Sequence, residues 1–379
     1  MRKTLVCGAV FAAACVSAVA VPVGAHATTP APTPPVPSAT PPGDLGGSGT
    51  ESPSTSSTTL PPGGPEGDPQ GGTPGGTPGG TPGGEPVPDG EPDGTVTAHA
   101  VMVTPELPKF RTYSYGKSAA QRVDAYWRDE GPRAKPRPTV LILHGGYWQS
   151  GDKGGGWKYF ARRLTEQGFV VLSANYRLAP KAQWPAQRDD SLSALDFVKT
   201  HARLWNADPT RVAVVGSSAG GHLATQLGTF GTGTGQVRAV VALSPPNNPL
   251  MAFRDGVKPG ATARQVKLRQ AVTDLLGCVP DIEGDNSGER DDCWTRLDDA
   301  GTTTHVSAGD APMLLMHGTG DFVPVAQSTE LARALREAGV QATVKSVEGD
   351  LHATQMLDDQ QTFPTIVSWL RKHLDAPAE

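Results

Sequence analysis

The stretch "VVGSSAGGHLATQ", residues 214–226, places two serines side by side between glycines. Ser218 has Gly216 two residues before it and Gly220 two residues after it, so it is the centre of a G-x-S-x-G pattern. In a nucleophile elbow a strand turns sharply into a helix, and only small residues fit at the two flanking positions. The same positions around Ser217 hold a valine and an alanine, and the valine would clash. The pattern therefore predicts Ser218 as the nucleophile.

Outward from this stretch, apolar runs alternate with segments of helical periodicity. Continuous apolar runs that end near glycine or proline are typical of strands covered on both faces. The predicted strands cover residues 138–146, 169–177, 211–218, 237–246, 312–321 and 342–349, after two short extended runs at 110–116 and 121–128. The predicted helices cover residues 157–168, 189–205, 219–228, 326–339 and 362–374. This alternation predicts an α/β fold with a mostly parallel central sheet and helices on both faces.

One segment, residues 247–310, interrupts the alternation and holds no clear strand. An insertion of this length is typical of a functional lid or cap. It contains Cys278 and Cys293, the only cysteines outside the N-terminal 27 residues. In an exported chain these two are expected to form a disulfide within the cap. Two cysteines so far apart, without clustered histidines, indicate no metal site.

The N-terminus predicts export. Residues 1–27 combine a basic start, an apolar run and an A-x-A site, which is the pattern of a secretory signal peptide. Two anchored forms are the alternatives: an uncleaved N-terminus that tethers the protein to the membrane, because the apolar run is long, and a lipid anchor at Cys15, where "AAAC" is a poor lipobox. Residues 28–95 are rich in proline, glycine and threonine and are predicted to be a disordered linker. Residues 96–379 are then the folded domain. The net charge of −5 without a basic block argues against nucleic acid as a partner, and the sequence gives no oligomeric state.

A serine hydroxyl needs a base and an orienting acid to become a good nucleophile. His352 lies late in the chain, between the last predicted strand and the last helix, and is the predicted base. The acid is expected between serine and base in chain order. Asp321 directly follows a predicted strand and fits, whereas Asp310 precedes that strand and Asp350 is only two residues from the histidine. We therefore expect Ser218, Asp321 and His352 to act together.

Acyl transfer also needs hydrogen-bond donors for the developing oxyanion. The backbone N–H of Ala219, which follows the nucleophile, is one candidate. Gly145 and Gly146 follow the first long strand and are the others, because glycine lets the backbone approach a substrate oxygen closely.

These segments together resemble an α/β-hydrolase of the group that contains hormone-sensitive-lipase-like esterases and BD-FAE hydrolases. The resemblance rests on "HGGYW" at 144–148, "NYRLAP" at 175–180, "DPTRVAVVGSSAGGHLA" at 208–224, "HGTGDFVPV" at 317–325 and His352. It departs from the lipase-like HGGG pattern at Tyr147, and "HGGYW" is similar to kynurenine-formamidase-like members instead. Tyr147 and Trp148 are accordingly expected to line the substrate pocket.

The expected function is that of a secreted serine carboxylic-ester hydrolase that works through an acyl-enzyme without a cofactor. Tyr147, Trp148, Trp157 and Trp184 are expected to be exposed. Together with the polar cap they favour short acyl or aromatic esters, or an ester linked to a carbohydrate, over triglycerides. An arylformamidase or amidase with the same triad is the first alternative. A non-catalytic binding module on a stalk is the second.

Overall fold

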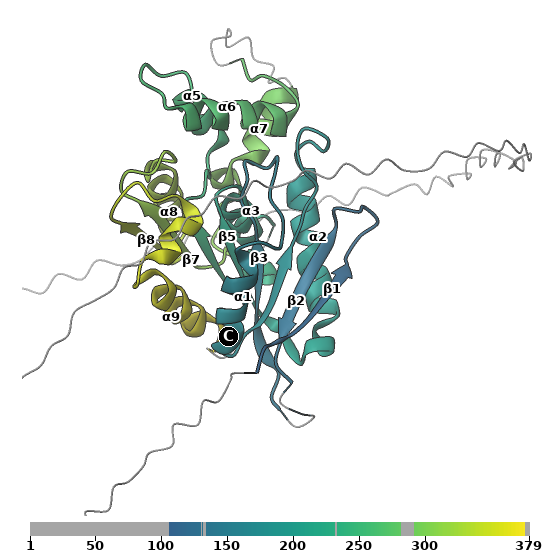
Figure 1. Cartoon of the computed structure of the whole chain (residues 1–379). Coiled ribbons are helices and arrows are strands. Elements are labelled where there is room, and N and C mark those ends of the chain that lie inside the picture. The colour runs from purple at the N-terminus through teal and green to yellow at the C-terminus, as the bar shows by residue number, and fades with distance from the viewer. Residues whose placement is uncertain (1–105, 130, 132–133, 232, 282–291, 376–379) are drawn as a thin grey trace, which may run out of the picture. The chain divides into compact units, whose positions relative to one another are not determined.

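The computed structural model describes residues 106–375, apart from residues 130, 132–133, 232 and 282–291 (Figure 1). The predicted signal peptide, the predicted linker and the domain boundary at residue 96 lie outside the described residues, so they remain predictions. Within the described helices, none combines the length and the apolar character that crossing a bilayer requires.

Eight strands form one sheet in the order β1-β2-β4-β3-β5-β6-β7-β8. β2 pairs antiparallel with both β1 and β4, and the pairs from β4 to β8 are all parallel. This confirms the predicted α/β fold with a mostly parallel sheet. The strands are β1 (Lys109–Ser114), β2 (Arg122–Trp127), β3 (Arg137–Leu143), β4 (Val170–Ala174), β5 (Ala207–Ser217), β6 (Ala239–Leu243), β7 (Met313–Gly318) and β8 (Ala342–Val347).

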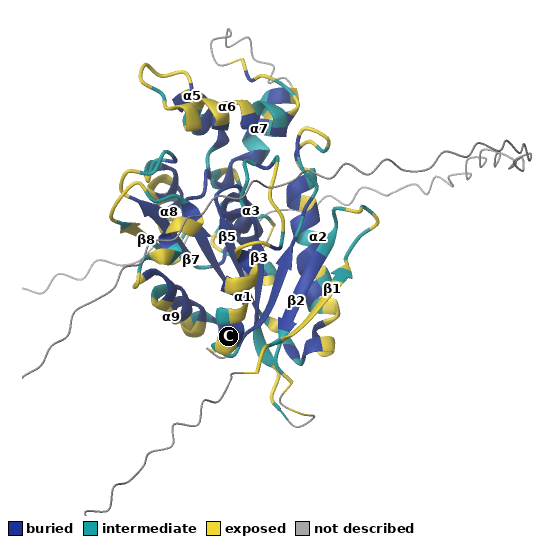
Figure 2. Ribbon diagram, in the orientation of Figure 1, coloured by how far each residue is buried: buried dark blue, intermediate teal, exposed yellow. Residues whose placement is uncertain are grey.

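Helices cover both faces of this sheet, and strand residues alternate between them because side chains on a strand point to opposite sides. On one face Leu141 and Val214 pack with α2 (Ala186–Thr200), α3 (Ala219–Thr229) and α8 (Ala326–Glu337). On the other, Ile142 and Val215 pack with α1 (Trp157–Glu166) and α9 (Thr362–Leu374). The central strands are buried on both faces (Figure 2), which explains why their sequences read as continuous apolar runs.

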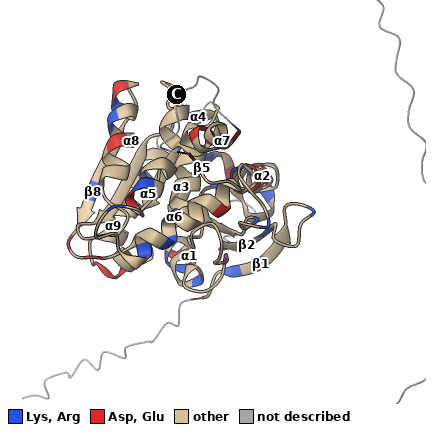
Figure 3. Cartoon of the chain, turned by 90° about the horizontal axis from the view of Figure 1, so that it is seen from above, with Lys and Arg blue, Asp and Glu red and all other residues tan. Residues whose placement is uncertain are grey.

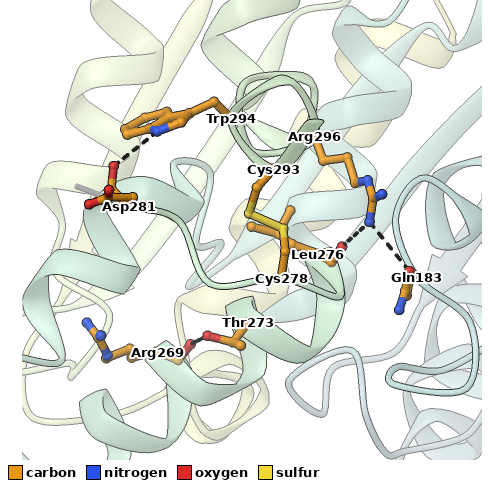
Figure 4. Close-up of a disulfide and its surroundings, with 9 residues drawn as sticks. All are labelled: Gln183, Arg269, Thr273, Leu276, Cys278, Asp281, Cys293, Trp294 and Arg296. Carbon is orange, nitrogen blue, oxygen red and sulfur yellow. Dashed lines mark hydrogen bonds between the residues drawn. A yellow bond between two sulfur atoms is a disulfide. The ribbon is translucent and has the colours of Figure 1, made fainter. Parts of the chain in front are cut away.

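The insertion between β6 and β7 folds as a helical cap, which Figure 1 shows above the sheet. It contains α5 (Pro249–Asp255), α6 (Ala263–Leu276), α7 (Asp292–Ala300) and a 3₁₀ helix, η2 (Thr302–His305). The predicted disulfide between Cys278 and Cys293 is confirmed, and it joins the segment after α6 to the first turn of α7 (Figure 4). The remaining short helices are α4 (Gly233–Gln236), η1 (Ala202–Trp205) and η3 (Ala353–Asp358).

Candidate active site

Ser218 lies at the sharp turn between β5 and α3. Its backbone has φ 51° and ψ −120°, and its N–H donates to the carbonyl of Leu243 at 2.7 Å. A Cβ atom on Gly216 would lie 2.0 Å from the carbonyl oxygen of Gly220, and one on Gly220 would lie 2.2 Å from that of Leu143. Neither position therefore accepts a side chain. This is the strained elbow geometry that the G-x-S-x-G pattern predicts.

Asp321 and His352 form a hydrogen-bonded pair. Asp321 follows β7 and His352 follows β8, and the imidazole Nδ1 lies 2.8 Å from the carboxylate Oδ1 and 3.1 Å from Oδ2. The carboxylate is fully buried, and its Oδ1 also accepts the N–H of Val323 at 3.0 Å. With Nδ1–H donating to the carboxylate, Nε2 of the imidazole keeps a lone pair that can accept a proton. The structure thus brings together the acid and the base that the sequence predicts.

Ser244 fixes the position of the histidine loop, and sequence analysis did not find it. Ser244 follows β6, and its hydroxyl accepts the N–H of Ala353, the residue after His352, at 2.8 Å. Both Ser244 and Ala353 have positive φ, 50° and 53°. Strain of this kind persists only where the surrounding structure imposes it. The available signal was a polar residue at the carboxyl end of a strand, the same position that marks Ser218.

The loop after β3 brings two glycines against the elbow. A Cβ atom on Gly145 would lie 2.8 Å from the carbonyl oxygen of Ser217 and 3.2 Å from Cβ of Ser218. Gly146 has φ 121°, which favours glycine. In the described part of the chain, the backbone N–H groups of Gly145, Gly146 and Ala219 make no hydrogen bond. Donors of this kind beside the serine are what an oxyanion requires.

The "NYRLAP" segment supports this loop from behind. The Tyr176 hydroxyl donates to the carbonyl of His144 at 2.8 Å, and the two rings stack with centroids 4.4 Å apart. The N–H of Ala179 donates to the carbonyl of Trp148 at 2.9 Å. The segment therefore holds the loop at both of its ends. The role of Tyr176 could not be read from the sequence, because nothing there indicates which loop the segment contacts.

The interpretation of Trp148, Trp157 and Trp184 as exposed aromatics is wrong, because all three side chains are buried. Trp148 is 0 % exposed, and its indole N–H donates to Nδ1 of His222 at 3.3 Å beneath the loop. Tyr147 and Trp148 both have φ 58°, so the backbone turns the second ring inward. Trp148 therefore anchors the loop instead of facing a substrate, whereas Tyr147 stays partly exposed.

Phe322 is a second residue at the site that sequence analysis missed, although it directly follows Asp321. Its ring lies 4.4 Å from the His352 ring and 6.2 Å from the Tyr147 ring, centroid to centroid. Burial raises the pKa of the Tyr147 hydroxyl, the positive charge of Arg264 opposes that shift, and Asp321 adds to it. Tyr147 and Phe322 thus form an aromatic surface that reaches the imidazole.

Two other histidines near the site are held neutral by burial. His222 on α3 accepts from Trp148 and donates from Nε2 to the carbonyl of Ala300 at 2.7 Å, and desolvation lowers its pKa to about 4. His317 lies between the Val323 carbonyl and the Ser328 hydroxyl, and desolvation lowers its pKa to about 4 as well. The ring nitrogens of both histidines are already engaged in hydrogen bonds, and His352 stays the predicted base.

No group of three or more histidine, cysteine, aspartate or glutamate side chains arranged to hold a metal occurs among the described residues. The profile of the BD-FAE family matches residues 124–335, a range that contains Ser218, Asp321, the glycine loop and the whole cap. The chain belongs to the BD-FAE family.

This BD-FAE chain is 28 % identical over 269 residues to "Probable carboxylic ester hydrolase LipM" of Mycobacterium tuberculosis, across 67 % of the chain and 58 % of that protein. It is also 28 % identical over 271 residues to "Esterase LipC" of the same organism, across 67 % of the chain and 62 % of that protein. The chain therefore spans about three fifths of the length of these curated relatives.

Solved structures show the same fold. EstE1, a carboxylesterase cloned from a metagenomic library, superposes with a TM-score of 0.59 at 21 % identity, over 73 % of this chain and 92 % of EstE1. Esterase B from Lactobacillus rhamnosis superposes with a TM-score of 0.57 at 23 % identity, over 72 % of this chain and 86 % of that one. The BD-FAE chain thus has the α/β-hydrolase fold.

Proposed function

We propose that this BD-FAE protein is a serine carboxylic-ester hydrolase that works through an acyl-enzyme. The observation that carries the proposal is the pairing of the buried Asp321 carboxylate with the partly exposed His352 imidazole, on the same sheet edge as the strained Ser218. The esterase names of LipM and LipC support the same reaction class.

In the proposed mechanism His352 Nε2 takes the proton of Ser218 as the hydroxyl oxygen attacks the ester carbonyl. Asp321 holds the Nδ1 tautomer and stabilises the imidazolium that forms. The backbone N–H groups of Gly145, Gly146 and Ala219 bind the oxyanion. The imidazolium then protonates the leaving alcohol, and a water molecule activated by the same base releases the acid from the serine.

For the substrate, we propose esters with a short acyl group or with an aromatic group. The aromatic surface of Tyr147 and Phe322 supports an aromatic ring near His352. Both cations nearest this surface, Arg264 and Lys267, come from the cap helix α6 and are exposed. A cap face of this kind favours a compact or polar substrate over a long acyl chain.

We also propose that the protein is exported. The Cys278–Cys293 disulfide supports an oxidising compartment, as does the pattern of residues 1–27. Detection of the mature protein in culture medium, as opposed to the membrane fraction, separates release from retention through an uncleaved N-terminus.

The reaction class is tested by the rate of 4-nitrophenyl acetate hydrolysis. Ser218→Ala is expected to lower kcat by about 10⁴-fold or more, because no other group replaces the nucleophile. Retention of near-wild-type turnover would overturn the proposal.

A series of 4-nitrophenyl esters from C2 to C16, with methyl ferulate, tests which acyl group the enzyme prefers. A rate maximum at C10 or beyond would overturn the short-acyl preference. A higher kcat/KM for N-formylkynurenine than for all esters would favour the formamidase.

A further inference from the structure

The cap helix α6 places two cations on the aromatic surface at the active site. The Lys267 ammonium lies 4.7 Å from the centroid of the Tyr147 ring. The Arg264 guanidinium lies 5.7 Å from the centroid of the Phe322 ring. The two residues are three apart on the same helix, so they lie on one face of it. Figure 3, which views the molecule from above, shows basic positions along α6.

Among the described residues, no ion pair joins Arg264 or Lys267 to a carboxylate, and both side chains are exposed. The first turn of α6 holds Arg264 and no acidic residue, a placement that the helix dipole disfavours. Glu348 and Asp350 are exposed on the loop before His352, but they pair with neither cation. Within the described part of the chain, two cations without a paired carboxylate therefore lie against Tyr147 and Phe322.

The geometry indicates which part of an ester would meet this charge. The imidazole of His352 protonates the leaving oxygen, so side chains packed on the imidazole border the alcohol part of the substrate. The centroid of the Phe322 ring lies 4.4 Å from that of the imidazole, and the Arg264 guanidinium makes a cation–π contact with the same Phe322 ring. The guanidinium lies 5.7 Å from the Phe322 ring centroid. The separation of guanidinium and imidazole is therefore at most the sum of these two distances. An anionic substituent across one benzene ring from the ester oxygen would fall within this range.

We propose that Arg264 and Lys267 select esters whose leaving alcohol or phenol carries an anionic group, with Tyr147 and Phe322 contacting its ring or sugar face. This rests on the proposed esterase function. The cations act on binding and on encounter with the substrate, so they change kcat/KM for charged esters. Each exposed cation contributes weakly, because solvent screens it.

The test compares 4-acetoxybenzoate, which is anionic, with 4-acetoxybenzamide, which is neutral and of the same shape. The readout is the ratio of their kcat/KM values, so differences in chemical reactivity cancel between enzyme variants. In Arg264→Ala/Lys267→Ala the ratio is expected to fall about threefold to tenfold relative to the wild type. The wild-type ratio is expected to fall as sodium chloride is raised, and the variant ratio much less.

Two further variants serve as controls. Arg264→Lys/Lys267→Arg keeps both charges and is expected to retain the wild-type ratio. Arg203→Ala/Lys345→Ala removes the same charge from η1 and β8, away from the cap, and is also expected to retain it. An unchanged ratio in Arg264→Ala/Lys267→Ala, with 4-nitrophenyl acetate still hydrolysed, would overturn the inference and leave the esterase proposal standing. Absence of hydrolysis of every ester by the wild type would overturn both.

Discussion

The carboxyl edge of the sheet and the cap are held in place in different ways. At the sheet edge, Ser218, Ser244 and Asp321 each follow a strand, and contacts between backbone atoms fix the elbow. The cap shares an apolar cluster with the α2, α3 and α8 face of the sheet, through buried residues such as Phe253, Leu268 and Leu297, and polar contacts from α7 add to this packing. From this difference we expect that the elbow tolerates almost no change in side-chain size, whereas the cap can change with the substrate of the proposed reaction.

The polar contacts of the cap join the end of α7 to α3, to α2 and to Trp184, which lies just before α2. Asp299 accepts the indole N–H of Trp184 at 2.7 Å and pairs with Arg188 at 2.8 Å. The carbonyl of Ala300, the last residue of α7, accepts from His222 at 2.7 Å and from Gln226 at 3.0 Å. Sheet-edge variants are therefore expected to remove activity, and cap variants to change stability or selectivity.

The largest expected effect at the sheet edge outside the nucleophile is that of Asp321→Asn. The buried amide would hold the imidazole in the wrong tautomer, and kcat for 4-nitrophenyl acetate is expected to fall about 10⁴-fold. Asp350→Asn, an exposed change two residues before His352, is the matched control and is expected to alter kcat less than twofold. Equal effects of the two changes would contradict the assignment of the acid.

In the cap, Cys278→Ser/Cys293→Ser is expected to lower the free energy of unfolding by about 3 kcal/mol, because the bond closes a loop across 15 positions of sequence. The variant is expected to keep most of its kcat, since neither cysteine contacts Ser218 or His352. Denaturant unfolding and 4-nitrophenyl acetate kinetics on the same samples measure both quantities. A catalytic loss as large as that of Asp321→Asn would show that the two regions are not separable.

The smallest effect concerns the junction of the two regions at His222. Its folded pKa of about 4 lies below the unfolded value, so the unfolded chain binds a proton first as the pH falls. The contribution of neutral His222 to the free energy of unfolding is fully present above pH 6.5 and is lost as the pH falls toward 4. Between pH 7 and pH 5 the wild type is expected to lose about 2 kcal/mol more than His222→Gln. Equal losses, measured by denaturant unfolding at both pH values, would mean that His222 is not the titrating group.

The sequence predicts the sheet and much of the site because both depend on local patterns. Doubly buried strands have continuous apolar runs, and the elbow needs glycines at fixed spacing. The inward turn of Trp148 depends on positive φ at two non-glycine residues, which no local pattern indicates. Phe322, Arg264 and Lys267 come together only when the cap packs on the sheet. The signal peptide, the linker and the catalytic roles remain predictions.

The most direct test of the account is to locate the covalent bond formed with a fluorophosphonate probe by peptide mass spectrometry. We expect one phosphonyl group on Ser218, labelling of Ser217→Ala at the wild-type rate, and no labelling of Ser218→Ala. His352→Ala is expected to label far more slowly, because the base that activates the hydroxyl is lost. Labelling on Ser217, or no labelling of the wild-type protein, would contradict the assignment of Ser218 as the nucleophile.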